Sequence, residues 1–120
     1  MQTLTYEFPA DRPAARRSHV GVVGSGDLEV LMTPADGAAR VRVRTSVDGF
    51  DTVWRTVLER FFARHRVAAS FELNDFGATP GVVTLRLRQA IEEGQATEKR
   101  KVTEEGKAIE EGQAIEEGKA

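Results

Sequence analysis

The chain has 120 residues, with 17 Lys plus Arg against 19 Asp plus Glu, no Cys and a formal net charge of −2. This length suits one domain and excludes a large two-domain enzyme. The charge balance argues against binding to nucleic acid, which requires a strongly basic face. Without Cys there is no disulfide and no thiolate nucleophile, and His19 and His65 are too few for a metal site built from histidines.

The first eight residues lack the basic flank and apolar core of a secretion signal, and no apolar run reaches the roughly 18 residues of a membrane span. We therefore expect a soluble cytoplasmic protein that binds neither membrane nor nucleic acid.

The composition changes abruptly near residue 91. Residues 1–90 contain twelve Arg, no Lys and ten acids, whereas residues 91–120 contain nine Glu, four Lys and one Arg in five six-residue units such as IEEGQA and IEEGKA. A six-residue period places the repeated Ile on different sides of a helix, so the repeat builds no continuous apolar stripe. We expect a folded domain over 1–93 and a charged repeat tail over 94–120 that is disordered or a frayed helix.

The first half of the domain has the period of two that is typical of β-strands. Alternation predicts a strand over 3–8, and apolar runs predict strands over 20–23 and 28–32, joined by a hairpin-like bend at 24–27. A turn at 34–37 precedes a strand over 40–47. The side chains expected to face the core from the first and last of these strands are Leu4, Tyr6, Phe8, Val41, Val43 and Val47.

The second half begins with a helical period. Apolar residues between 53 and 62 form one broad stripe, with Asp51 as the expected cap and a basic cluster at 64–66 near the C-terminal end. The three aromatic residues expected in the core are Trp54, Phe61 and Phe62.

A short strand at 71–73 and a loop at 75–80 follow. The segment 80–93 reads as a helix with Thr79 as N-cap and Pro80 in the first position, although Val83, Leu85 and Leu87 also alternate as in a strand. The predicted fold class is α+β, a small mainly antiparallel sheet with two helices packed on it.

Ser25 is the most accessible candidate nucleophile, because it lies between Gly24 and Gly26 at the tip of the predicted bend. The surrounding residues match neither the G-x-S-x-G elbow of α/β-hydrolases, which precedes a helix, nor a P-loop, which needs a Lys. On pattern alone, this segment and the adjacent Asp27 are consistent with an ordinary turn.

Other polar residues allow weaker hypotheses. His65 is a candidate base but suits a helix end better, and His19 is expected to be structural or exposed. Asp75 is expected to form a turn before Gly77. The arginines that could contact phosphate groups or an acidic partner are Arg12, Arg16 and Arg17.

Two segments carry a specific resemblance to a known family. VGVVGSGDLEVL at 20–31 and DFGATPGVV at 75–83, with the opening TLTYEFP, resemble the acyl carrier protein (delta subunit) of malonate decarboxylase. The resemblance covers about residues 1–93, and the repeat after them departs from the family.

The resemblance implies a carrier subunit with no catalytic or metal-binding residue of its own. In this family the serine that matches Ser25 bears 2′-(5″-phosphoribosyl)-3′-dephospho-CoA through a phosphodiester, and the terminal thiol of that group carries acetyl or malonyl while malonate is converted to acetate and CO₂. Gly24, Gly26 and Asp27 would form the flanking turn. The implied partners are the acyl-transferase and decarboxylase subunits, a malonyl transferase and the prosthetic-group transferase.

Two alternatives stay open at this point. One is the related acyl carrier (gamma) subunit of citrate lyase, which uses the same kind of prosthetic group. The other is a non-catalytic interaction module in which Ser25 is unmodified and forms only a turn.

Overall fold

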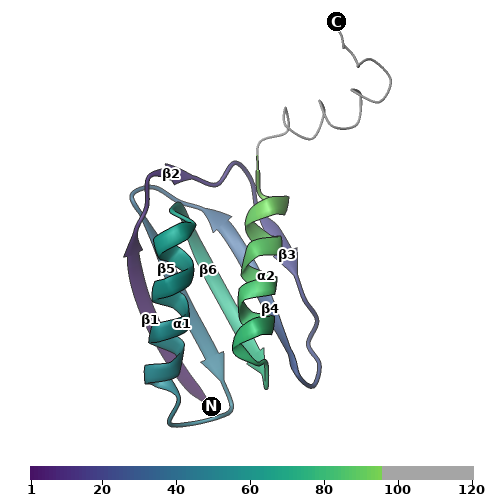
Figure 1. Cartoon of the computed structure of the whole chain (residues 1–120). Helices are drawn as coiled ribbons and strands as arrows, with labels where there is room; N and C mark the ends of the chain where they lie inside the picture. The colour runs from purple at the N-terminus through teal and green to yellow at the C-terminus, as the bar shows by residue number, and fades with distance from the viewer. Residues whose placement is uncertain (96–120) are drawn as a thin grey trace, which may run out of the picture.

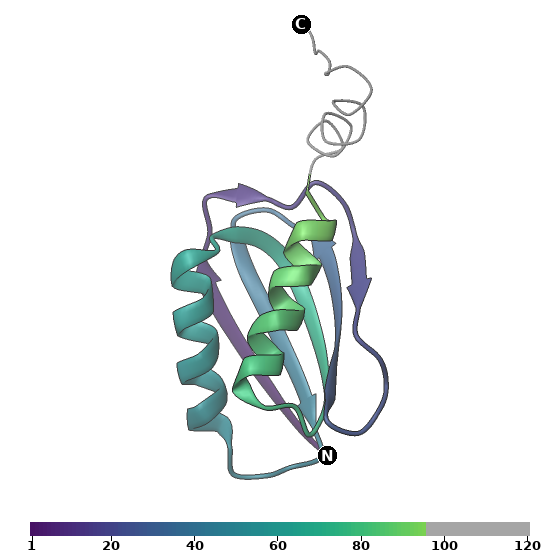
Figure 2. The ribbon, with the colours of Figure 1, turned by 45° about the vertical axis from the view of Figure 1, so that its right-hand side comes forward.

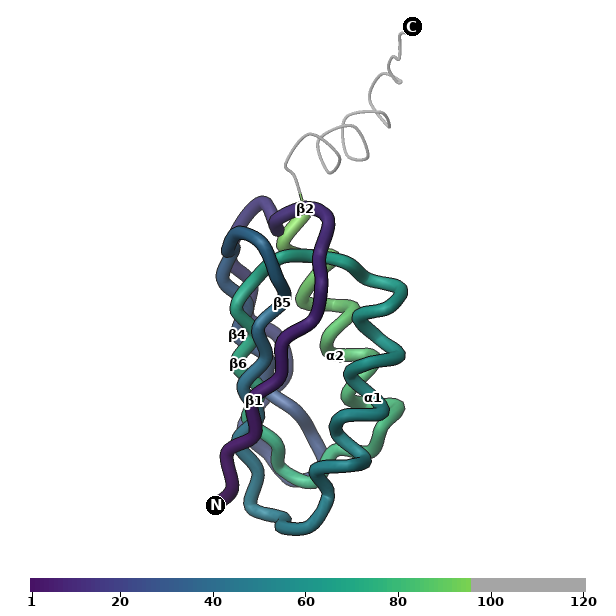
Figure 3. The backbone as a smooth tube through the Cα atoms, turned by 90° about the vertical axis from the view of Figure 1, so that its left-hand side faces the viewer, coloured from purple at the N-terminus to yellow at the C-terminus, as the bar shows by residue number. Residues whose placement is uncertain are grey.

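The computed structural model describes residues 1–95 as an α+β domain in two layers, with both helices on one face of a sheet (Figures 1 and 3). This confirms the predicted fold class, and the part of the expected tail from 96 to 120 lies outside the described residues. The elements in chain order are β1 (Gln2–Pro9), β2 (Arg12–Pro13), β3 (Ser18–Val20), β4 (Asp27–Pro34), β5 (Ala38–Thr45), α1 (Asp51–Arg64), β6 (Val67–Phe76) and α2 (Pro80–Glu93).

The sheet has the strand order β1-β5-β6-β4-β3, with the short β2 paired to β6. Three pairs are antiparallel (β1 with β5, β3 with β4, β4 with β6), whereas β5 and β6 are parallel. A parallel pair needs a long crossover connection, and α1 supplies it between β5 and β6. Because β6 separates β4 from β5, the predicted turn at 34–37 joins two strands that are not neighbours.

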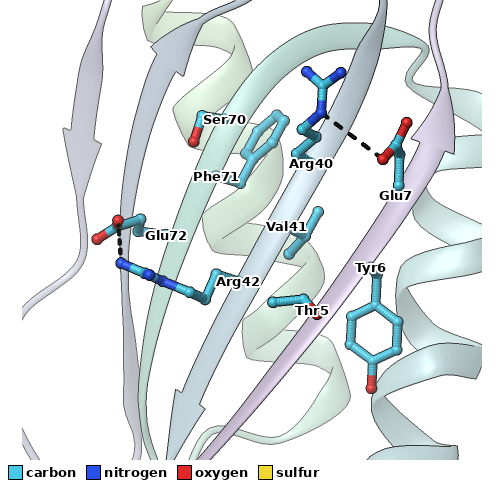
Figure 4. A pocket seen from close by; sticks show the side chains of 9 residues that line it. All are labelled: Thr5, Tyr6, Glu7, Arg40, Val41, Arg42, Ser70, Phe71 and Glu72. Atoms are coloured by element: carbon cyan, nitrogen blue, oxygen red, sulfur yellow. Dashed lines mark hydrogen bonds and ion pairs between the residues drawn. The ribbon is translucent and has the colours of Figure 1, made fainter.

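Strand β5 shows how the sheet divides into two faces. Val41 and Val43 are buried toward the helices, as predicted, while the arginines at 40, 42 and 44 lie on the uncovered face. On that face Arg40 Nε lies 3.8 Å from a Glu7 carboxylate oxygen and Arg42 Nη2 lies 2.7 Å from one of Glu72 (Figure 4). The inward prediction for Val47 is wrong, because β5 ends at Thr45 and Val47 is 42% exposed.

Helix α1 packs the predicted aromatic residues into the core, with Trp54, Phe61 and Phe62 all buried. Val53 departs from the predicted stripe and is 45% exposed, since it lies at the edge of the stripe rather than over the sheet. The predicted cap at Asp51 is also wrong. The N-cap is Phe50, and Asp51 is the first helical residue, whose carboxylate accepts a hydrogen bond from its neighbouring backbone N–H.

Helix α2 confirms the predicted N-terminus, because the Val82 N–H donates to Thr79 Oγ1 (3.3 Å) and Pro80 follows the cap. The strand alternative for this segment is wrong. The helix buries side chains at helical spacing, whereas Leu85, which would have faced inward in a strand, is 41% exposed. The buried residues of α2 are Val83, Leu87, Ala90 and Ile91.

The C-terminal end of α2 is fixed to the first third of the chain. Gly94, which the sequence analysis places at the start of the tail, is a buried C-cap whose carbonyl accepts hydrogen bonds from the backbone N–H groups of Ala15 and Arg16. Within residues 1–95, neither helix is long and apolar enough to span a membrane.

Candidate functional site

The loop that carries Ser25 joins the antiparallel strands β3 and β4, at the same end of the domain as the N-termini of both helices (Figures 1 and 2). The predicted bend is therefore present, but it is longer than expected. Val22 and Val23, predicted as strand, are 61% and 67% exposed, because the chain leaves the sheet at Gly21, whose φ is +83°.

Ser25 is exposed in a turn closed by the Asp27 N–H, which donates to the Gly24 carbonyl (3.1 Å). Gly26 has a φ of +81° and would meet no atom within 4 Å if it carried a Cβ. Its N–H donates to the Phe76 carbonyl (2.6 Å), which fixes the loop to the end of β6. The backbone around Ser25 is thus anchored while the residue itself is exposed.

A second anchor of the loop is the carboxylate of Asp27. Arg86 of α2 donates to both carboxylate oxygens (Nε to Oδ1, 2.9 Å; Nη2 to Oδ2, 2.8 Å), and the backbone N–H groups of Val22 and Leu28 donate to the same carboxylate. The Arg86 hydrogen bonds are the largest cause, and the Leu28 N–H the next, that lower the pKa of Asp27 to about 2. Asp27 is therefore ionised at neutral pH and ties the loop to the helix.

Arg86 is the site residue that the sequence analysis missed. It lies 59 residues from Asp27, and a single Arg in an amphipathic helix gives no local signal of its partner. Only the packing of α2 beside β4 brings the two side chains together.

The neighbouring loop after β6 is ordered by Asp75, as expected from its position before Gly77. This buried carboxylate accepts hydrogen bonds from Thr45 Oγ1 (2.8 Å) and from the Ala78 N–H (2.9 Å). Asp75 lies within β6 itself, so the strand runs further than the predicted 71–73. The ordered turn places Gly77 against the backbone of Gly26.

The three N-terminal arginines lie far from this loop. They follow β1 at the end of the domain where α2 terminates, and Arg16 Nε donates to the Glu93 carbonyl (3.1 Å). The loop between β3 and β4, which carries Ser25, lies at the other end of that helix (Figure 2).

Neither histidine is placed to activate Ser25. The ring of His19 lies 2.8 Å from a Glu29 carboxylate oxygen, and His65 stacks on Phe61 at the C-terminal end of α1. Residues 1–95 also contain no group of three or more side chains arranged to ligate a metal ion. Within residues 1–95, the arrangement is an exposed serine on a fixed loop with neither histidine beside it and with the Asp27 carboxylate held by Arg86, which suits attachment of a group.

Comparison with known proteins gives a consistent result. Residues 15–94 match the model of the malonate decarboxylase delta subunit family (MdcD). The chain is 54% identical over 95 residues to the malonate decarboxylase acyl carrier protein of Azotobacter vinelandii, covering 78% of this chain and 96% of that protein. It is 56% identical, with the same coverage, to the protein of that name from Pseudomonas aeruginosa strain UCBPP-PA14.

A solved structure is similar over the same part of the chain. One chain in the crystal structure of a Pseudomonas malonate decarboxylase hetero-tetramer in complex with malonate superposes with a TM-score of 0.74 at 49% identity, over 78% of this chain and 98% of that one. These matches favour the malonate system over the citrate lyase alternative. The chain belongs to the malonate decarboxylase delta subunit family.

Proposed function

We propose that this chain is the acyl carrier subunit of a malonate decarboxylase and that Ser25 is the attachment point of its prosthetic group. The observation that carries the proposal is the exposed Ser25 on a loop that is fixed by Gly26 to β6 and by Asp27 to Arg86. A modifying enzyme needs an accessible hydroxyl. A fixed loop at the attachment point lets the attached arm pivot about one point.

The proposed group is 2′-(5″-phosphoribosyl)-3′-dephospho-CoA in phosphodiester linkage to Ser25, and when bound it supplies the thiol that carries acetyl or malonyl. The residues of the loop fit a bulky phosphodiester. Gly24 and Gly26 have no side chains to obstruct it, and the space beside Gly26 is open. The absence of Cys from the chain agrees with a thiol that comes from elsewhere.

The chain's own contribution is to anchor and present the arm, and the bond-breaking steps would take place on partner subunits. The proposed partners are the acyl-transferase and decarboxylase subunits, the malonyl transferase and the prosthetic-group transferase, all in the cytoplasm. A tethered arm raises the local concentration of the acyl group at successive active sites, which is the physical advantage of a carrier.

Intact-mass spectrometry tests this proposal. The full chain is coexpressed with the prosthetic-group transfer enzymes, alongside Ser25→Ala and the matched control Ser70→Ala, which removes another exposed serine on the uncovered sheet face. We expect the mass of the phosphoribosyl-dephospho-CoA group on the wild type and on Ser70→Ala, and none on Ser25→Ala. An unmodified wild-type chain, under conditions where the A. vinelandii relative is loaded, would refute the proposal.

A further inference from the structure

A groove between α1 and α2 begins next to the Ser25 loop. Its first part, termed here the apolar pocket, has a volume of about 270 Å³ and is lined by Phe50, Val53, Trp54 and Gly77, among others. Phe50 and Val53 are 48% and 45% exposed, an unusual position for large apolar side chains. The pocket is smaller than the roughly 300–1,000 Å³ typical of sites for whole small molecules, so its size suits a fragment such as a single base.

The second part of the groove, termed here the cationic groove, has a volume of about 760 Å³ and is lined by Arg60, Arg64, His65 and Arg88. Val57 and Pro80 line both parts, which makes them continuous. Negative charge is absent from the lining, and within residues 1–95 none of the three arginines forms an ion pair.

Two arginines on the uncovered sheet face, by contrast, lie beside carboxylates. There Arg40 and Arg42 each face a glutamate (Figure 4). In the groove, Arg64 and Arg88 instead lie near His65, whose protonation they oppose. The pKa of His65 lies below its ordinary value chiefly because of burial, and Arg88 and Arg64 lower it further, while Glu92 opposes them.

The apolar pocket lies within reach of a group attached at Ser25. Gly77 lines the pocket, and a Cβ on it would lie 3.8 Å from the Gly26 nitrogen. Two other pocket residues come from the sheet. Asp75 belongs to β6, one strand away from β4, and Thr45 belongs to β5, two strands away. Because neighbouring strands lie about 4.8 Å apart, the pocket is some 5–10 Å from the start of β4, where the Ser25 loop ends.

We propose that this groove is the docking site of the nucleotide part of the arm, with the adenine base in the apolar pocket and the diphosphate on the arginines of the cationic groove. This inference rests on the proposed function. The side chains of the groove suit these two groups, because purines stack on aromatic side chains and a guanidinium group can bind two phosphate oxygens at once. The order of the groups along the arm also matches the order of the two parts of the groove. Counted from the serine, the adenosine comes first, the diphosphate second and the thiol end last.

Docking at this site must be weak, since the arm has to leave the groove to deliver its acyl group. A short tether gives an effective concentration in the millimolar range, so even a millimolar affinity holds a large share of the arm in the groove. The docked arm would keep the thiol close to the domain until a partner subunit competes for it.

Nuclear magnetic resonance of the full chain, with loading verified by mass, tests the proposal. Trp54 is the one tryptophan of the chain, so its indole N–H gives a resolved signal inside the apolar pocket. The test variant replaces Arg60, Arg64 and Arg88 with Ala. The matched control replaces the same number of arginines on the uncovered sheet face, at positions 40, 42 and 44. We expect loading to shift the Trp54 signal in the wild type and the control, and this shift to be largely lost in the test variant.

A second measurement separates this inference from the attachment proposal. Free 3′-dephospho-CoA is titrated into unloaded Ser25→Ala, with Trp54 fluorescence as the readout and 4′-phosphopantetheine, which lacks the adenosine, as the control ligand. We expect saturable quenching by 3′-dephospho-CoA alone, weakened about tenfold or more when the three groove arginines are removed, because each contributes charge-assisted hydrogen bonds. This assay is valid whether or not Ser25 becomes loaded.

Two results would overturn the proposal. In one, a fully loaded chain gives the same Trp54 signal as the unloaded chain and free 3′-dephospho-CoA causes no saturable change. In the other, the groove responds to added decarboxylase subunits and not to either form of the nucleotide, which would make it a protein-docking surface.

Discussion

Two glycines of the Ser25 loop offer a controlled test of how the loop is built. Gly21 and Gly26 have nearly the same backbone conformation, with φ of +83° and +81°, so replacing either with Ala costs about 1–2 kcal/mol for the left-handed conformation alone. Their surroundings differ. A Cβ at Gly26 meets nothing within 4 Å, whereas one at Gly21 overlaps the Leu28 carbonyl oxygen, a backbone atom that cannot rotate away.

Gly21→Ala therefore has to displace the β3–β4 pair as well. Loss of one or two of its backbone hydrogen bonds adds about 0.5–1.5 kcal/mol each, for a total of about 1.5–5 kcal/mol against about 1–2 kcal/mol for Gly26→Ala. Urea unfolding of the full chain followed by Trp54 fluorescence gives both free energies of unfolding. Equal losses in the two variants would show that the Leu28 contact does not constrain the loop.

Three further changes probe the anchors of the domain. The low pKa of Asp27, about 2 against an ordinary 3.8, gives stability that is complete above about pH 4 and is lost as the pH falls through about 2. Urea midpoints measured against pH should show this acid loss in full in the wild type and only in part in Arg86→Ala, because the backbone N–H groups of Leu28 and Val22 still donate to the carboxylate. Thr79→Ala removes the α2 cap and should lower the free energy of unfolding by about 1 kcal/mol, measured by urea titration. Leu87→Ala empties a fully buried position and should cost about 2–5 kcal/mol in the same assay, whereas Leu85→Ala, at an exposed position, serves as its control.

The parts of the fold that follow from local periodicity could be predicted from the sequence. The alternation in β1 and β5, the aromatic stripe of α1 and the Thr79 cap of α2 depend on residues within a few positions of one another, and each is confirmed. The Ser25 bend was also visible, because two glycines between apolar runs are a local signal.

The two errors in predicted burial share a physical cause, since hydropathy does not distinguish an apolar side chain in the core from one that lines a surface groove. Val47 and Val53 were predicted to be buried, but both line the apolar pocket and stay more than 40% exposed. The parallel pairing of β5 with β6 escaped prediction for a different reason. It depends on how α1 crosses the sheet, a property of the whole chain rather than of any segment.

Helix α2 serves the two proposed roles of the domain from opposite sides. Residues two apart on a helix point in directions about 200° apart, so Arg86 and Arg88 cannot share a partner. Arg86 turns toward β4 and holds the Ser25 loop through Asp27, whereas Arg88 turns toward α1 and lines the cationic groove. The attachment point and the docking groove therefore use different side chains of α2. The helix itself fixes the distance between them. Replacing Arg88 should leave the Ser25 loop intact and alter only what happens to the arm after it is attached.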